Sequence, residues 1–296
     1  MCVRLWSGRG VWRRWRPISW LLWVSACADP RALPPAYVRF QPARLLLEGD
    51  TLTLEAPIDA WVYPAGRFLA VAEPGGRLPI VPAETTPILI AGGVRENGLA
   101  VSRKVYPFWR FDTLLGPLVP EGEIAYTPLY RYFPDTVLRY FLQEDFESPQ
   151  LSLNLVNAGQ PDAAPLRRTI EGPRRGFWAG EVVLGPYSDF RAESTLPFEF
   201  PQSEVWAELS LRGDRNLGVG LTIENRATGA LVDRRIYLVL RPADTAWTTF
   251  FVNLTPWMAG QGTLFRYRLY LTSAGDTVGT YKLYLDDVRI LSFKKL

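Results

Sequence analysis

Residues 205–225 read VWAELSLRGDRNLGVGLTIEN, and within them apolar residues recur at every second position in two separate runs. The apolar members are Val205, Ala207, Leu209 and Leu211 in the first run and Leu217, Val219, Leu221 and Ile223 in the second. Because successive side chains of a strand point to opposite faces, this period predicts two β-strands, each with one buried face and one wet face.

The same alternation returns in Phe265–Leu271, and residues 137–296 as a whole predict roughly ten strands without a convincing amphipathic helix. Two stacked antiparallel sheets, a jelly-roll β-sandwich, accommodate this many strands. We therefore expect an all-β protein whose larger domain covers residues 137–296.

Residues 37–112 predict a smaller domain, because short apolar runs alternate with turn signals. The expected strands are Tyr37–Leu47, Thr51–Ala56, Ala60–Tyr63, Arg67–Ala72, Leu78–Val81, Ile88–Ile90 and Leu99–Tyr106. Asn97 and Gly98 tolerate positive φ and predict a tight hairpin. This spacing favours a small Ig-like β-sandwich.

Two further segments are rich in proline. Residues 28–36 (ADPRALPPA) predict a short tether. Residues 113–136 contain four prolines and have no clear period, which predicts a connector that packs on both domains.

The first 27 residues have the order of a signal peptide. Five arginines accompany the apolar run Pro17–Val24, which is too short to span a bilayer, and Val24-Ser25-Ala26-Cys27 follows it. The cysteine at the cleavage position resembles the lipobox of bacterial lipoproteins, which implies a lipid on Cys27. The alternative is an ordinary secretory signal with an incidental cysteine.

Removal of this segment changes the charge balance. The chain has 33 basic and 30 acidic residues, and five of the basic residues lie in residues 1–27, which leaves 28 basic against 30 acidic residues. The basic excess of the whole chain therefore does not indicate nucleic-acid binding. Cys2 and Cys27 are the only cysteines, so we expect a mature chain without disulfides that depends on its hydrophobic core.

Four segments resemble a family of uncharacterised lipoproteins of Bacteroidota. Ile58–Val71 and Ile88–Phe108 resemble the N-terminal part of these proteins, and Trp247–Pro256 and Tyr281–Leu291 resemble strands near the end of their C-terminal domain. That domain is in turn similar to carbohydrate-binding-module and galactose-binding-like jelly rolls. The resemblance implies a fold and a location, and it implies no catalytic residues.

We do not expect an enzyme. The absence of histidine excludes Ser-His-Asp and Cys-His nucleophile systems, and the sequence has no phosphate-binding loop and no GxGxxG motif. Two carboxylates alone can support glycoside hydrolysis. Acidic residues such as Glu144, Glu181 and Glu204 do not follow the Glu-x-Asp-x-x-Glu pattern of some jelly-roll glycosidases, and we interpret them as solvated surface acids.

A structural calcium ion is the one cofactor that the sequence suggests. Glu147 lies near the start of the second domain, and Asp286 and Asp287 lie in its final strand. Resemblance to carbohydrate-binding jelly rolls implies that these strands lie close together, where such proteins often hold Ca²⁺. Carboxylate oxygens are the ligands that calcium prefers. The alternative is that Asp287 caps a turn or pairs with Arg289.

Two strands of the second domain predict a sugar-binding face. Its candidate residues are Trp206, Glu208, Arg266, Arg268 and Tyr270, which occupy the predicted wet faces. Aromatic rings stack on the C–H faces of sugars, and charged groups hydrogen-bond their hydroxyls. The alternative is packing of the tryptophan against the first domain or the connector, since Trp and Arg are also enriched at protein interfaces.

Asp-Thr followed by an apolar residue occurs five times, where ordinary residue frequencies give about one occurrence. The threonines are Thr51, Thr113, Thr136, Thr245 and Thr277. The pattern resembles the acceptor of the general protein O-glycosylation system of Bacteroidota. The alternative is turn chemistry, in which Asp ends a turn and Thr begins a strand.

These observations predict a lipid-anchored, non-catalytic protein of the cell envelope, expected at the outer membrane. Its second domain would bind a glycan or dock to another envelope protein. The alternative is a structural or assembly component of an envelope complex without a small-molecule ligand.

Overall fold

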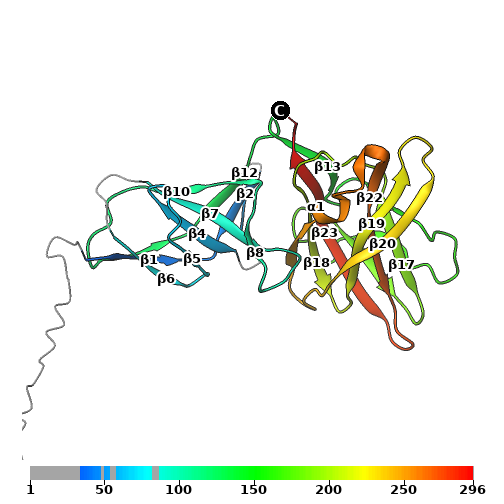
Figure 1. The fold of residues 1–296 in the computed structure, drawn as a ribbon. Helices are drawn as coiled ribbons and strands as arrows, with labels where there is room; N and C mark the ends of the chain where they lie inside the picture. The colour runs from blue at the N-terminus through cyan, green and yellow to red at the C-terminus, as the bar shows by residue number, and fades with distance from the viewer. Residues whose placement is uncertain (1–33, 48–49, 54–57, 82–86, 296) are drawn as a thin grey trace, which may run out of the picture.

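The computed structural model describes residues 34–47, 50–53, 58–81 and 87–295. Strands dominate this part of the chain and form two regions that lie next to each other (Figure 1). The expected all-β fold is confirmed. Cys27 and residues 28–33 of the predicted tether lie outside the described residues.

The first region contains three small sheets. The three-stranded sheet has the order β11 (Glu123–Tyr126), β1 (Ala36–Phe40) and β6 (Arg77–Ile80). The five-stranded sheet has the order β10 (Asp112–Leu114), β7 (Ile88–Arg95), β4 (Asp59–Pro64) and β5 (Ala70–Ala72), and β8 (Arg103–Val105) also pairs with β7. The four-stranded sheet has the order β3 (Asp50–Thr53), β2 (Arg44–Leu47), β12 (Leu129–Tyr132) and β9 (Trp109–Arg110).

Residues 113–136, which we expected to form a connector, instead supply two strands of the first region. β11 pairs in parallel with β1, and β12 pairs in parallel with β2. The expected strand Tyr37–Leu47 is also split between β1 and β2, on either side of Gln41-Pro42-Ala43. The connection from β1 to β2 and the connection from β11 to β12 run side by side between the same two sheets. Two hydrogen bonds join them: Gln41 N–H donates to Tyr126 O, and Arg44 N–H donates to Pro128 O.

Asn97 and Gly98 form a turn between β7 and β8, but the seven residues 96–102 join the two strands, so the connection is longer than the predicted tight hairpin. Asn97 and Gly98 both have positive φ, 57° and 72°. Asn and Gly adopt this left-handed conformation at low cost, which is why this pair of residues can form the turn.

The second region is a sandwich of two sheets. The six-stranded sheet has the order β15 (Leu166–Thr169), β16 (Ala179–Leu184), β23 (Tyr281–Phe293), β18 (Val205–Gly213) and β21 (Thr248–Asn253), and β13 (Leu138–Glu144) also pairs with β23. The five-stranded sheet has the order β14 (Leu153–Leu155), β17 (Asp189–Ser194), β22 (Phe265–Ala274), β19 (Leu217–Asn225) and β20 (Leu231–Leu240). A short helix, α1 (Thr255–Met258), and a 3₁₀ turn (Gly262–Leu264) follow β21.

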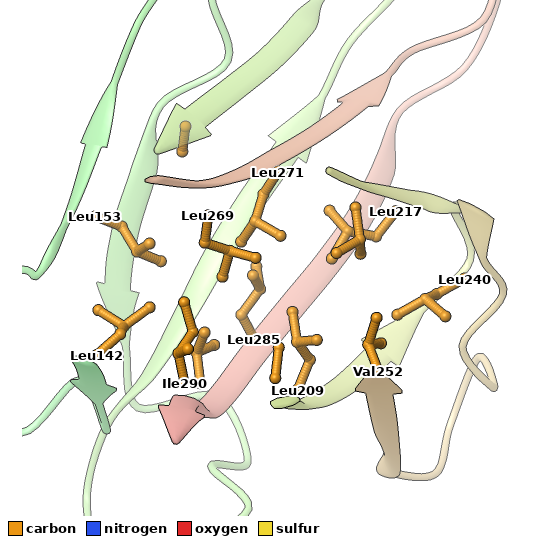
Figure 2. Packing of buried hydrophobic residues seen from close by; sticks show 14 of the residues in the cluster. Leu142, Leu153, Leu209, Leu217, Leu240, Val252, Leu269, Leu271, Leu285 and Ile290 are labelled. Atoms are coloured by element: carbon orange, nitrogen blue, oxygen red, sulfur yellow. The ribbon is translucent and has the colours of Figure 1, made fainter. Parts of the chain in front are cut away.

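One large apolar cluster fills the space between these two sheets (Figure 2). The alternating residues of the predicted strands point into it, including Leu209 from β18, Leu217 from β19 and Leu269 from β22. The alternation therefore located the inner faces of three strands correctly, and this core fixes the positions of their outer faces.

Candidate functional site: the cleft between the two regions

The five residues predicted to form a sugar-binding face do not share a surface. Trp206 and Glu208 lie on β18 in the six-stranded sheet. Arg266, Arg268 and Tyr270 lie on β22 in the five-stranded sheet of the second region. The two sets are therefore on different sheets of the sandwich, and the prediction of one joint face is wrong. A common period indicates the outer side of each strand but not which sheet contains the strand.

Trp206 is 0% exposed and lies in a cluster that joins the two regions. Its ring meets that of Tyr106 from the first region edge to face, with centroids 5.4 Å apart. Phe108 and Trp109 of the first region and Phe251 of the second belong to the same cluster. Trp206 therefore packs against the first region, as the alternative prediction stated, and the first region covers this part of β18.

Glu208 is buried beside Trp206 and links the regions through hydrogen bonds. The hydroxyls of Tyr106 and Tyr132 donate to its carboxylate over 2.6 and 2.7 Å. Arg289 Nη1 lies 3.7 Å from Glu208 Oε2 and compensates the charge. Burial, together with the Glu208 charge, raises the pKa of both tyrosines well above the ordinary value, so both remain neutral donors.

The Asn97 hairpin forms a second link between the regions. Asn97 N–H donates to Phe251 O over 2.8 Å, and Asn253 N–H donates to Asn97 Oδ1 over 2.9 Å. The Asn253 amide also donates to Glu96 Oε1 over 2.6 Å. Hydrogen bonds and apolar packing therefore hold the two regions in one arrangement.

A cleft of about 350 Å³ opens beside this interface. Both regions line it: Arg131 and Tyr132 come from β12, Tyr140 and Gln143 come from β13, and Arg289 comes from β23. Arg175, Asp135, Glu144 and Asp145 complete the polar part of the lining. Along β13 a second hollow, of about 510 Å³, shares Tyr140 and Gln143 with the cleft. The two hollows together offer rings, amides and guanidinium groups to a ligand.

Glu144 is held in place by its own segment. Its carboxylate accepts hydrogen bonds from Phe146 N–H, over 2.8 Å, and from Ser152 N–H. Burial raises the pKa of this carboxyl. The side chain therefore serves to close the loop after β13, with its two oxygens already occupied by backbone donors.

The acidic pair in β23 is enclosed by arginines. Asp287 lies 2.6 Å from Arg174, 3.3 Å from Arg175 and 2.8 Å from Arg289. Asp286 instead accepts the backbone N–H groups of Arg174 and Arg175, over 2.9 and 3.3 Å. Burial, together with the charge of Asp287, raises the pKa of Asp286 to about 7.

This donor set does not suit the predicted calcium ion. The Asp287 oxygens contact guanidinium groups, and Glu147 Oε1 accepts the N–H groups of Phe177 and Trp178. Within the part of the chain that the structure describes, no three His, Cys, Asp or Glu residues are grouped closely enough to hold a metal ion. Three arginines already supply positive charge at Asp287. The alternative prediction, that Asp287 pairs with Arg289, named one of these three.

An ion network on the outer face of the second region's five-stranded sheet includes Arg266, Arg268 and Tyr270. Glu224 binds Arg266 and Arg268 over 2.6 and 2.7 Å. The guanidinium of Arg234 lies 5.2 Å from the centre of the Tyr270 ring. These side chains are paired with one another, so a ligand would have to displace existing contacts to use them.

The five candidate threonines differ in accessibility. Thr136, Thr245 and Thr277 are exposed in turns or bends, whereas Thr113 is half-buried within β10. Thr51 lies in β3, and its side chain is outside the described part of the structure. Asp112 and Asp276 each accept the N–H of the threonine that follows, over 2.9 and 2.8 Å, in agreement with turn chemistry at those two sites. O-glycosylation stays a prediction.

Sequence reasoning missed the cleft because its residues come from distant segments. Arg131 and Tyr132 were assigned to the connector, and Arg175 lies in a loop that carried no motif. Tyr130 and Tyr132 are two residues apart and so lie on one face of a strand, but this single repeat is too short to predict one.

No protein-family model matches the chain, and no curated protein matches it either. Similar solved structures include a family 11 carbohydrate-binding module from Clostridium thermocellum in complex with a β-1,3-1,4-mixed-linked tetrasaccharide, with a TM-score of 0.39, 13% identity, and coverage of 52% of this chain and 95% of the module. They also include a family 22 xylan-binding domain from Paenibacillus barcinonensis, with a TM-score of 0.36, 15% identity, and coverage of 53% and 96%. These structural neighbours are carbohydrate-binding modules.

Proposed function

We propose that this protein is a non-catalytic, glycan-binding protein of the cell envelope, anchored to the outer membrane by a lipid on Cys27. The order of basic, apolar and small residues before Cys27 supports the anchor. The resemblance to lipoproteins of Bacteroidota supports the location. No helix in the described part of the chain is both long and apolar enough to cross a membrane.

The cleft between the regions carries the proposal. Its volume of about 350 Å³ falls in the range typical of small-ligand sites, and such sites often lie between domains. Tyr132 and Tyr140 supply rings, Gln143 supplies an amide, and Arg131 and Arg175 supply guanidinium groups. Sugars present C–H faces and hydroxyls, which are the partners of rings, amides and guanidinium groups.

Two buried acidic residues, Glu144 in the cleft lining and Asp287 next to Arg289 of that lining, are engaged in structural contacts. Glu144 accepts two backbone N–H groups, and Asp287 contacts three arginines. A general acid or a nucleophile must present a carboxyl oxygen to the substrate. These carboxylates are already bound by the protein itself, so we assign them to structure.

The proposal is tested by titrating oligosaccharides selected on a glycan array into the full chain in detergent. Gln143→Leu and Arg175→Gln should each raise the Kd about tenfold, since each removes polar contacts inside the cleft. Arg167→Gln, at an exposed position outside the cleft, is the matched control. An array without any bound glycan, or equal affinities for all variants, would contradict the proposal.

A structural or assembly role without a small ligand is the second candidate, and one observation favours it. β20 is an edge strand of the five-stranded sheet, and Leu231, Val232, Ile236 and Val239 are exposed on it. Long apolar edge strands can pair with a strand of another chain. Cross-linking in the native envelope that captures one protein through β20, together with a blank glycan array, would support this role.

A further inference from the structure

We propose that the first region carries a second binding face, for an anionic glycan, at which a strip of aromatic rings ends beside two arginines that have no ion-pair partner among the described residues. The aromatic strip consists of Trp61, Phe68, Tyr63 and Phe111. The inference extends the proposed glycan binding to another hollow, which shares Arg131 with the cleft, and to a class of ligand.

The four rings of the strip are in contact. The centroid of Phe68 lies 5.5 Å from that of Trp61 and 5.6 Å from that of Tyr63. Tyr63 and Phe111 are nearly parallel, at 6° and 6.0 Å. Phe68 is 55% exposed and Phe111 is 51% exposed, so the strip presents ring surface to the solvent. Contiguous exposed apolar surface commonly marks a binding site.

The backbone beneath the strip fixes its shape. Trp61 of β4 is paired with Ala91 of β7, and its indole ring extends over Gly93, where a methyl group would overlap it. The absence of a side chain at Gly93 therefore allows the indole to lie against the sheet. A ring held in this way is already ordered, so a ligand that stacks on the strip pays little conformational entropy.

Two arginines lie at the Phe111 end of the strip. Arg110 of β9 and Arg131 of β12 are directly opposite each other in the antiparallel pair. They line a hollow of about 120 Å³ together with Phe111, Asp112 and Leu129. Both arginines are exposed, and neither forms an ion pair with an acidic residue among the residues described.

Asp112 lines the same hollow but forms no ion pair with either arginine among the described residues, and one carboxylate leaves a net positive charge there. Its carboxylate accepts the Tyr126 hydroxyl over 2.6 Å and the N–H groups of Leu129 and Thr113 over 2.9 Å each. Like charges that face each other across strands are unfavourable. An anion between the two guanidinium groups would remove that repulsion, and carboxylates and sulfates match the donor geometry of arginine.

The aromatic strip and the two arginines together indicate the class of ligand. Rings alone would suit any apolar partner, and arginines alone would suit any anion. A chain of sugars that carries carboxylate or sulfate groups presents C–H faces to the strip and charge to Arg110 and Arg131. Carboxylated and sulfated glycans share this chemistry, so the test includes both.

The experiment titrates oligogalacturonate, chondroitin sulfate and neutral dextran into the full chain in detergent. We expect an acidic glycan to bind at least about tenfold more tightly than dextran, with an affinity that falls as salt rises. Arg110→Gln, and separately Phe68→Ser combined with Phe111→Ser, should each weaken it about tenfold. Arg131 is left unchanged because it also lines the cleft.

Arg167→Gln and Phe177→Ser are the matched controls, because both positions are exposed and lie outside the strip and the cleft. Gln143→Leu separates the two sites, since it should weaken binding in the cleft and leave the acidic glycan bound. Equal affinity of the strip variants and the controls for acidic glycans overturns the proposal. So does self-association of the chain that disappears in the Phe68→Ser, Phe111→Ser variant without acidic-glycan binding, which would identify the strip as a protein interface.

Discussion

The second region encloses its own core, whereas the first region shares part of its core with its neighbour. The cluster between the two large sheets draws its members from the second region alone. The first region has a small cluster around Val38 and Ile90, and its other buried rings pack against Trp206 and Phe251 of the second region. We infer that the second region is stable alone and that the first depends on the contact.

Trp206→Ala should have the largest effect on this dependence. It removes the ring that Tyr106 packs against, and truncation of a buried Trp costs about 3–5 kcal/mol. We expect the first region to unfold at lower urea than the second, so that one transition becomes two. Leu269→Ala is the control, because it lowers the stability of the second region without separating the transitions. A single, unshifted transition for Trp206→Ala would contradict the shared core.

The neighbours Asp286 and Asp287 should respond to pH in opposite directions. Burial raises the pKa of Asp286 from 3.8 to about 7. The folded state therefore holds this proton more tightly than the unfolded state, and the free energy of unfolding falls as pH rises from about 4 to about 7. The effect of this group alone is on the order of 3–4 kcal/mol.

Burial opposes ionisation of Asp287 as well, but the charges of Arg289, Arg174 and Arg175 lower its pKa below 3.8. Its contribution to stability is present above about pH 4 and is lost as pH falls through the folded pKa. NMR titration of both carboxyls, with urea unfolding at pH 4, 5.5 and 7, measures the two effects. An Asp286 that titrates below pH 5 would rule out the raised pKa.

Tyr132→Phe tests the hydrogen bonds at the contact between the regions. It removes the hydroxyl that donates to Glu208, and a hydrogen bond to a charged group contributes about 2 kcal/mol. We expect the transition of the first region to move by about this amount. Tyr187→Phe, at an exposed ring, should change nothing, and equal shifts for the two variants would argue against the Glu208 network.

Asn97→Ala should have the smallest effect, about 1 kcal/mol. It removes the acceptor for Asn253 N–H and places alanine at a φ of 57°. Asn97→Gly keeps the backbone conformation and removes only the amide, so the difference between the two variants isolates the turn. Hydrogen exchange of Asn253 N–H reports on this contact directly, and unchanged exchange in both variants would show that the hairpin does not hold it.

The sequence predicted the elements whose signal is local. Alternation over β18, β19 and β22 identified strands and inner faces, and Asn97-Gly98 identified a turn. The parallel pairing of β11 and β12 was missed because each strand has four residues and its partner lies some eighty residues earlier. A strand of four residues is too short to show a recognisable alternation of apolar and polar residues.

The candidate site was predicted poorly for a related reason. Alternation assigns Trp206 and Glu208 to the outer side of β18, but whether that side meets water or another region depends on tertiary packing. The acidic residues in β23 likewise looked available for calcium because nothing in the sequence brings Arg174 next to Asp287. The cleft combines β12, β13 and β23, and only the folded chain brings these strands together.

The position of β1 has a mechanical consequence. It is the first described strand, and it is hydrogen-bonded on both sides, antiparallel to β6 and parallel to β11. A lipid anchor on the N-terminal side would pull on the start of β1, while the remainder of the protein pulls on the far end of β11. In a parallel pair these two pulls run along the strands in opposite directions, so the hydrogen bonds between them are loaded together in shear. A tether attached in this way resists tension better than one that could be peeled open bond by bond.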